Sequence, residues 1–260
     1  MTTTYASYMQ LVADLPRTIN RVAEEPVVAR ETRYYRETIG SIKTIDDFMA
    51  DSRLLNYALK AHGLEEMGYA KALIRKVLVE GVADENSFAN KLADSRYKDF
   101  ARTFDFAAMG ETTTSFERAR QGTVDRYMRQ TLEETAGEDN TGVRLALYFE
   151  RKAPEIGNYY EILADEALGQ VVRTALGLPM EVAASDIDQQ VKLFEDRFDL
   201  GDFKDSEKLG TFIARFTALW ELENPSGATT ESAILLNPTS NVGISADLLM
   251  SFNTLKLGGR

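Results

Sequence analysis

A stretch near the start of the chain recurs 114 residues later without a gap. Residues 34–64 read YYRETIGSIKTIDDFMADSRLLNYALKAHGL, and residues 148–178 read YFERKAPEIGNYYEILADEALGQVVRTALGL. The matching positions are Tyr34-Tyr35 with Tyr148-Phe149, Ala50-Asp51 with Ala164-Asp165, Leu54 with Leu168, Ala61 with Ala175, and Gly63-Leu64 with Gly177-Leu178. A period this long exceeds that of thin solenoid repeats and predicts a duplicated helical subdomain. The matched residue types serve packing and capping rather than catalysis.

Apolar residues recur at helical spacing on both sides of this repeat. Three such stripes are Ala70, Leu73, Ile74, Val77 and Leu78; Leu168, Val172, Ala175 and Leu176; and Leu209, Phe212, Ile213, Phe216, Leu219 and Trp220. Each stripe follows the period of an α-helix with one buried face, while strand-like alternation is nearly absent. We therefore expect an all-α fold of two tandem helical lobes related by internal duplication, with a C-terminal tail.

The repeat and the turn signals divide the chain into five parts. We expect a partly helical leader at 1–25, lobe one at 26–112, lobe two at 140–222, and a linker with an amphipathic tail at 223–260. Residues 113–139 between the lobes are expected to form a connecting helix that ends in the polar turn Gly137–Asn140. In the second halves of the lobes we align Val77 with Phe198, which requires seven extra residues in lobe two.

A smaller motif inside the repeat carries an aspartate before each of three predicted helices. Ala50-Asp51-Ser52-Arg53 recurs as Ala93-Asp94-Ser95-Arg96 and more loosely as Ala164-Asp165. An N-cap aspartate explains the pattern, because its carboxylate accepts hydrogen bonds from the free N–H groups of the first helical turn. We predict that Asp51, Asp94 and Asp165 are helix N-caps. The alternative interpretation is a set of three equivalent acidic sites.

Other helix ends are marked by glycine and by capping pairs. Gly63 and Gly177 stand where helices are expected to end, and glycine adopts the left-handed conformation of that position without steric cost. Thr44 with Asp47 resembles a capping box, and so does Thr114 with Glu117.

The composition argues against several classes of partner. The net charge is −11, and residues 131–260 hold the whole acidic excess, with 22 acidic and 11 basic side chains. Such a chain repels nucleic acid and anionic lipid, so we expect neither as a partner. No apolar run approaches the ~20 residues of a membrane-spanning helix, and the N-terminus lacks the basic and apolar regions of a secretory signal. We expect a cytoplasmic protein without membrane insertion.

Few residues suggest chemistry. The chain has no cysteine, and its one histidine, His62, precedes Gly63 at a predicted helix C-terminus, where a cation is favoured. The run Asp196, Asp199, Asp202, Asp205 and Glu207 contains calcium-type ligands. Its spacing differs from that of an EF-hand loop, so helix capping is the competing interpretation. Nucleotide-binding and zinc-protease motifs are absent from the sequence. We expect no catalytic residues, no metal site and no cofactor.

The last part of the chain differs in composition from the lobes. Residues 224–230 have linker content, and a short amphipathic stretch follows. Its apolar residues are Ile244, Leu248, Leu249, Phe252 and Leu255. We predict that they form an interaction tail, which docks on the body of the protein or on a partner.

Four segments resemble a largely alphaproteobacterial family of unknown function. They are residues 35–42, YRETIGSI; 87–97, SFANKLADSRY; 142–154, GVRLALYFERKAP; and 171–179, VVRTALGLP. The genes of that family often lie within flagellar gene clusters, and some members are labelled as flagellar rod-related. Rod subunits have coiled-coil termini, whereas this chain has no sustained heptads.

The resemblance implies a role in flagellar assembly or motility. Together with the lack of catalytic motifs, it leads us to expect a non-enzymatic cytoplasmic protein that acts through contacts with a flagellar protein partner. Two alternatives stay open at this point. One is a structural component of the flagellar basal body, and the other is a calcium-binding or enzymatic protein.

Overall fold

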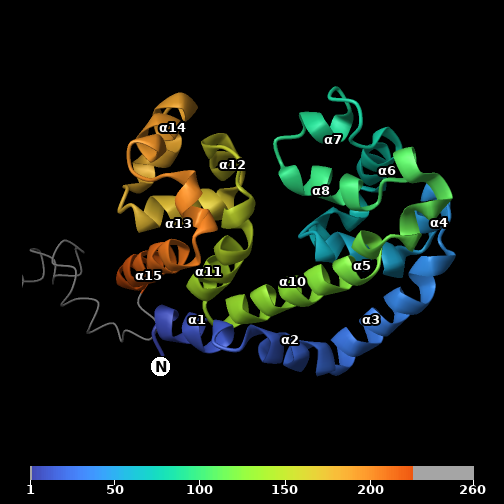
Figure 1. Cartoon of the computed structure of the whole chain (residues 1–260), viewed down its shortest axis with the longest axis horizontal. Coiled ribbons are helices and arrows are strands. Elements are labelled where there is room, and N and C mark those ends of the chain that lie inside the picture. Colours follow the sequence, from blue (N-terminus) through green and yellow to red (C-terminus); the bar gives the residue numbers. More distant parts are fainter. Residues whose placement is uncertain (1, 225–260) are drawn as a thin grey trace, which may run out of the picture.

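The computed structural model describes residues 2–224 of the chain, and these form helices joined by turns (Figure 1). They contain no strand, so the prediction of an all-α fold is confirmed. Within this range no helix is both long enough and apolar enough to cross a membrane. The candidate tail residues Ile244, Leu248, Leu249, Phe252 and Leu255 lie outside the described residues.

The base of the molecule is built from the leader and the longest of the described helices. The leader contains α1 (Thr4–Val12) and α2 (Leu15–Glu24), and it continues into α3 (Pro26–Thr38). Helix α10 (Gln121–Asp139) runs beside α2 along this base (Figure 1). Tyr8 of α1 and Val22 of α2 are buried in the core, so the leader is part of the packed body.

Lobe one rises from one end of α10. After η1 (Ile39–Ser41) come α4 (Ile45–Ala50), α5 (Ser52–Ala61), η2 (Glu65–Tyr69), α6 (Lys71–Glu80), α7 (Phe88–Lys91), α8 (Ser95–Thr103) and α9 (Phe106–Met109). The short turns η3 (Gly110–Ser115) and η4 (Glu117–Ala119) lead into α10. Helix α5 packs along α10, and Tyr57 stacks on Tyr127 with ring centroids 3.8 Å apart.

Lobe two stands at the other end of α10. Its elements are α11 (Thr141–Lys152), η5 (Ala153–Glu155), α12 (Tyr159–Ala164), α13 (Glu166–Ala175), η6 (Met180–Ala184), α14 (Ile187–Glu195), η7 (Leu200–Lys204) and α15 (Ser206–Glu223). Helix α1 packs against α11 and α15, where the Thr4 backbone N–H donates to Glu221 Oε2 at 2.9 Å. The first described helix of the chain, α1, is thus in contact with the last, α15.

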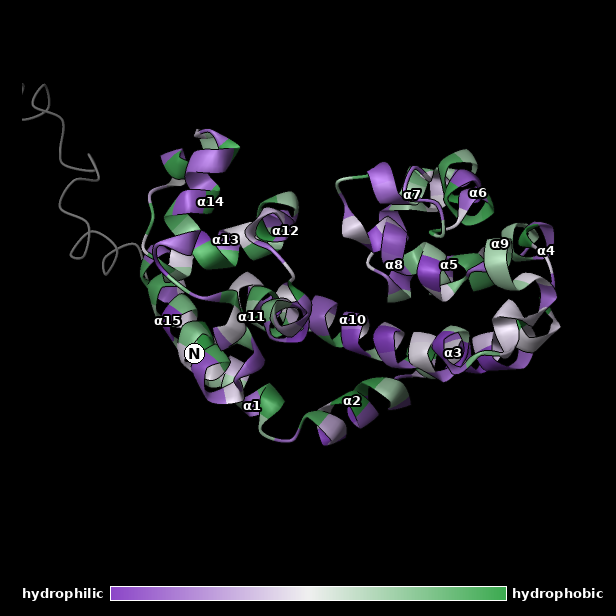
Figure 2. Ribbon diagram, turned by 45° about the horizontal axis from the view of Figure 1, so that its top comes forward, coloured by the Kyte–Doolittle hydropathy of each residue, from purple (hydrophilic) through white to green (hydrophobic). Residues whose placement is uncertain are grey.

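One connected cluster of buried apolar side chains extends through both lobes and the base. Figure 2 shows hydrophobic and hydrophilic residues on the same helices in both lobes, which is the pattern of amphipathic helices around a shared core. The predicted stripes supply this core, since Ile74, Val77, Phe216 and Trp220 are all buried.

The repeat positions make the same local contacts in both lobes. Leu54 N donates to Asp51 Oδ1 at 2.9 Å, and Leu168 N donates to Asp165 Oδ1 at 3.0 Å. Both helices then end in the same double hydrogen bond, which closes on a glycine with positive φ. The bonds are Leu64 N to Leu59 O and Gly63 N to Lys60 O in lobe one, and Leu178 N to Arg173 O and Gly177 N to Thr174 O in lobe two.

Three local predictions differ from the structure. Thr114 and Glu117 form no capping box, because the Thr114 hydroxyl is buried and donates to the Ile42 carbonyl, and α10 begins only at Gln121. Residues 137–139 are helical rather than a turn. Helix α10 continues to residue 139, and the next residue, Asn140, already caps α11. The seven-residue shift pairs Val77, which lies inside α6, with Phe198, which lies beyond the end of α14.

Candidate functional site

A cleft of about 1060 Å³ lies between the two lobes, with α10 as its floor. Lobe one contributes the end of α5, η2 and the start of α8, and lobe two contributes α11 and the junction of α12 with α13. The lining residues are Ala61, His62, Gly63, Glu65, Glu66, Asp94, Arg96, Asp99, Arg126, Gln130, Glu133, Glu134, Arg144, Leu145, Tyr148, Arg151, Lys152, Glu155, Ala164, Asp165, Glu166, Ala167 and Gln170. Fourteen of these 23 side chains are charged.

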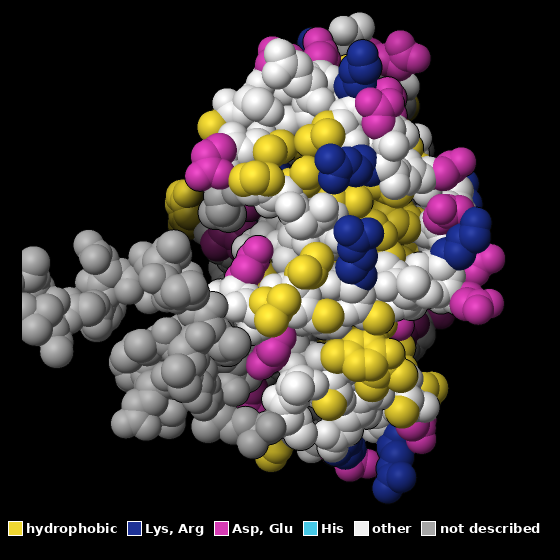
Figure 3. All heavy atoms as spheres, turned by 90° about the vertical axis from the view of Figure 1, so that its left-hand side faces the viewer, with side chains coloured by type: hydrophobic (Ala, Val, Ile, Leu, Met, Phe, Trp, Pro, Cys, Tyr) yellow, Lys and Arg dark blue, Asp and Glu magenta, His cyan; other side chains and the backbone are white. Residues whose placement is uncertain are grey.

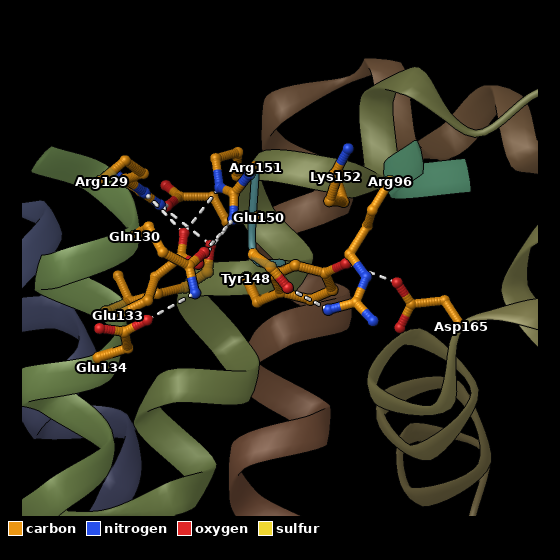
Figure 4. A network of polar contacts seen from close by, with 12 residues as sticks. Arg96, Arg129, Gln130, Glu133, Glu134, Tyr148, Glu150, Arg151, Lys152 and Asp165 are labelled. Atoms are coloured by element: carbon orange, nitrogen blue, oxygen red, sulfur yellow. Dashed lines mark hydrogen bonds and ion pairs between the residues drawn. The ribbon is translucent and has the colours of Figure 1, made fainter. Parts of the chain in front are cut away.

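A buried ion network holds the floor to the wall of lobe two (Figure 4). The carboxylate of Glu133 on α10 accepts from Arg151 Nε at 2.8 Å and from Arg151 Nη2 at 2.7 Å. It also accepts from Arg129 Nε at 3.2 Å, and Arg129 Nη2 in turn donates to Glu150 at 2.6 Å. The Glu133 side chain is only 2 % exposed. A carboxylate this deeply buried is tolerated because two guanidinium groups satisfy both of its oxygens.

The network continues from α10 toward lobe one. Gln130 Nε2 donates to Glu134 Oε1 at 3.0 Å, and Lys60 of α5 forms an ion pair with Glu134 at 2.7 Å. On the other side, burial followed by the charge of Glu150 raises the pKa of the Tyr8 hydroxyl on α1. Helices α5, α10 and α11 therefore share one polar network, and α1 packs against α11 beside it.

An ion pair joins the two walls directly. Lys152 Nζ on α11 lies 3.3 Å from Asp99 Oδ2 on α8, and 3.7 Å from Glu155. In the wall of lobe one, Arg96 binds Asp94 through Nη2 at 2.8 Å and also donates to the carbonyl of Gly63. Arg96 thus fastens the start of α8 to the end of α5.

His62 lies at the foot of the lobe-one wall, and its imidazole is not the cation that a helix C-terminus favours. Its ring is buried, with edge contacts to Phe100 and Phe104. Burial, followed by the nearby charges of Arg126 and Lys152, holds the pKa of the imidazole well below its ordinary value. His62 is therefore neutral, and it caps α5 through its backbone N–H, which bonds to Leu59 O at 3.0 Å.

Tyr148 and Asp165 face each other across the wall of lobe two. The Tyr148 hydroxyl donates to Asp165 Oδ2, while Asp165 Oδ1 accepts from the Leu168 backbone N–H. Burial, followed by the negative charge of Asp165, raises the pKa of this hydroxyl, so it stays a hydrogen-bond donor. Tyr34 makes the same bond to Asp51 at 2.6 Å in lobe one.

The three aspartates predicted as N-caps precede α5, α8 and α13. Each carboxylate accepts a hydrogen bond from a backbone N–H of its helix: Asp51 from Leu54, Asp94 from Arg96, and Asp165 from Leu168. Asp94 and Asp165 both line the cleft, one from each wall, whereas Asp51 does not. The three carboxylates therefore do not form one cluster.

In the acidic run before α15, two aspartates cap helical turns and a third forms an ion pair. Asp199 Oδ1 accepts from Gly201 N at 2.7 Å, Asp205 Oδ1 accepts from Glu207 N at 2.9 Å, and Asp202 pairs with Lys208 at 2.5 Å. Among residues 2–224, no group of three or more acidic or histidine side chains is arranged to hold a metal ion.

Sequence reasoning missed Arg129, Glu133 and Arg151. The signal available was Arg129 with Glu133 at an i,i+4 spacing, which is usually a solvated pair on a helix surface. Their burial depends on α11 packing along α10, which the sequence does not specify. The arrangement positions α11 against the floor.

The family described as "Protein of unknown function (DUF1217)" matches residues 61–209. The chain is also similar to a protein from Agrobacterium tumefaciens whose crystal structure was determined in a structural genomics programme. The identity is 55 %, the match covers 85 % of this chain and 94 % of that one, and the TM-score is 0.81. No curated protein matches the chain. The family match covers more than half of the chain, and it follows that the chain is a member of the DUF1217 family.

Proposed function

We propose that this protein is a non-enzymatic cytoplasmic factor of flagellar assembly or motility, which binds a segment of a partner protein in the cleft between its lobes. The single observation that carries the binding role is the cleft itself, which is open, large and lined by both lobes. The process is supported by the resemblance to a family whose genes often lie in flagellar clusters.

The character of the cleft favours a polypeptide over a small metabolite. Small-molecule pockets span ~300–1,000 Å³ and are mostly apolar with a few polar groups. At about 1060 Å³ this cleft slightly exceeds that range, and most of its lining residues are charged. Nine of the charged residues are acidic and five are basic. A polar segment with several basic side chains complements that balance, as charge complementarity steers partners to their sites.

The outer face of lobe two offers a second set of contacts to a protein partner. It is formed by α14, α15 and α1, and Figure 3 shows apolar side chains gathered over this side of the molecule. Ile187 on α14 is 58 % exposed and Leu222 on α15 is 75 % exposed. Exposed apolar groups rimmed by charges are common where proteins bind one another.

Cell fractionation together with an in-frame deletion tests this proposal. A deletion strain complemented with the tagged wild-type protein should regain swimming, and the tagged protein should remain in the cytosolic fraction. Recovery of the protein with purified basal bodies would favour the structural-component alternative. A deletion strain that swims normally would contradict a flagellar role altogether.

Charge-reversal variants then test whether the cleft is the binding site without a change of fold. Glu65→Lys with Glu166→Lys reverses one exposed charge on each wall, whereas Glu111→Lys with Glu223→Lys makes the same charge change at exposed positions that do not line the cleft. We expect the first pair to impair swimming and the second to leave it intact, with both variants folded. Equal swimming by the two variants would argue against the cleft as the binding site.

A further inference from the structure

A second cavity, of about 340 Å³, lies at the N-terminus of α10 and shares no lining residue with the cleft. It is formed where the end of α3 and η1 meet η4 and the start of α10. Its lining residues are Tyr35, Arg36, Ile39, Glu117, Arg120 and Gln121. None of these residues has a part in the function proposed above.

Two arginines in this pocket are positioned without a carboxylate partner. Arg36 Nη2 donates to Gln121 Oε1 at 3.0 Å, and the Arg120 guanidinium packs against Gly40. Among the described residues, neither arginine has a carboxylate oxygen within 4.0 Å. This contrasts with the cleft, where Arg96, Arg151 and Lys152 are all paired.

A third arginine adds buried positive charge to the same corner. Arg118 lies in η4, between the lining residues Glu117 and Arg120, and its Nε and Nη2 atoms are buried with no acceptor in the described part of the chain. The ring of Phe116 lies under its guanidinium, 4.9 Å away. Buried donors without acceptors are rare, because each carries a desolvation penalty. Together with Arg36 and Arg120, Arg118 sets three guanidinium groups against the one carboxylate of the lining, Glu117, so this corner carries a local positive field.

The helix that starts at this pocket adds to the field. Helix α10 has 19 residues, and no side chain caps its N-terminus, which begins beside Arg120. The first N–H groups of a helix carry partial positive charge and bind anions, phosphate above all. The helix end and the three arginines are independent features that favour the same kind of ligand.

We propose that this pocket binds a phosphate group, either as inorganic phosphate or as a phosphate monoester. Guanidinium groups bind phosphate oxygens with paired N–H donors, and a phosphate offers more oxygens to surrounding donors than a carboxylate does. Glu117 also lines the pocket, and its carboxylate can accept a hydrogen bond from a phosphate that retains one proton. The cavity has room for a phosphate and a small ester group.

Isothermal titration calorimetry on the full chain tests this site, with inorganic phosphate in one series and O-phosphoserine in the other, at constant ionic strength set with chloride. We expect saturable one-site binding. Arg36→Gln and Arg120→Gln should each weaken it by about tenfold or more, because each removes charge-assisted hydrogen bonds. Tighter binding of O-phosphoserine would identify an ester as the ligand, and equal or tighter binding of inorganic phosphate would identify the free ion.

Two further variants make the test specific. Arg33→Gln is the matched control, because Arg33 is exposed on the same helix as Arg36 and does not line the pocket. Gly40→Ala leaves the charge unchanged but places a methyl group 3.1 Å from Arg120 Nη2, so it should displace that guanidinium and weaken binding. The proposal is overturned if the wild type shows no saturable binding, or if Arg120→Gln and Arg33→Gln bind phosphate equally well. Neither outcome bears on the cleft.

Discussion

The hydroxyl of Tyr148 donates a hydrogen bond to the carboxylate of Asp165, and the same pair of residue types meets 114 positions earlier, where Tyr34 donates to Asp51. In each case the other carboxylate oxygen accepts the backbone N–H three residues later. One aspartate thus fixes both the start of a helix and the preceding tyrosine. A common origin of the two halves remains a prediction, which superposition of residues 34–64 on 148–178 would test.

Replacement of the capping aspartates tests the role of this contact. Asp51→Ala and Asp165→Ala should each lower the free energy of unfolding by about 0.5–2 kcal/mol, because the first turn of the helix loses its acceptor. The asparagine variants keep an acceptor oxygen and should be milder. Urea denaturation of all four variants measures this. If alanine and asparagine are equally destabilising, the capping bond is not what the aspartate contributes.

The buried carboxylate of Glu133 should be the most sensitive position in the cleft floor. Glu133→Ala leaves Arg129 and Arg151 without their shared partner, and breaking a buried pair in this way costs about 3–5 kcal/mol. Glu134→Ala removes a more exposed carboxylate one residue later, and a change of ~1 kcal/mol or less is expected. Denaturant midpoints compare the two variants. Similar midpoints would mean that the network around Glu133 does not stabilise the fold.

The pH dependence of stability should carry a contribution from His62. Its pKa in the folded state is depressed by burial and by nearby cations, so the unfolded state binds the proton more readily. Stability from this group is therefore complete above the unfolded pKa of ~6.5 and falls as the pH drops below it. As the chain has one histidine, His62→Gln should flatten the stability profile below pH ~6.5. Parallel profiles for the two proteins would contradict a neutral buried imidazole.

A glycine in α11 should allow the close packing of the leader against α11 and α15. A Cβ atom at Gly142 would meet the Trp220 ring and would lie 2.8 Å from Thr4 Cγ2, so Gly142→Ala should push α11, α15 and α1 apart. Overpacking of this kind costs about 1–3 kcal/mol. Gly210 on α15 has nothing within 4 Å of its Cβ position, so Gly210→Ala should be neutral or stabilising. Thermal unfolding separates the two outcomes, and equal melting temperatures would rule out tight packing at Gly142.

The sequence correctly predicted those parts of the fold that depend on local chemistry. The apolar stripe at Leu209–Trp220 and the glycines at 63 and 177 each follow from spacing or backbone geometry, which neighbouring residues determine. The polar turn predicted at residues 137–140 was wrong, because Gly137 remains helical and the single capping residue Asn140 is enough to separate α10 from α11.

The cleft could not be predicted from the sequence, because it depends on contacts between segments that are distant along the chain. Asp99 and Lys152 are 53 positions apart and pair only once both lobes stand on α10. His62 was misjudged for the same reason, since Phe100, Phe104 and Arg126 bury it from other helices. Local sequence shows a helix end at His62, but it does not show which side chains cover that end.

Site-specific photo-crosslinking in motile cells tests the central claim that a partner segment binds in the cleft. A benzophenone amino acid at Gln170 lies in the lining, and the same group at the exposed Glu111 of η3 lies outside it and serves as the control. The account predicts one dominant adduct from Gln170, containing a flagellar protein, and no such adduct from Glu111. The absence of an adduct from Gln170, or the same adduct from both positions, would contradict it.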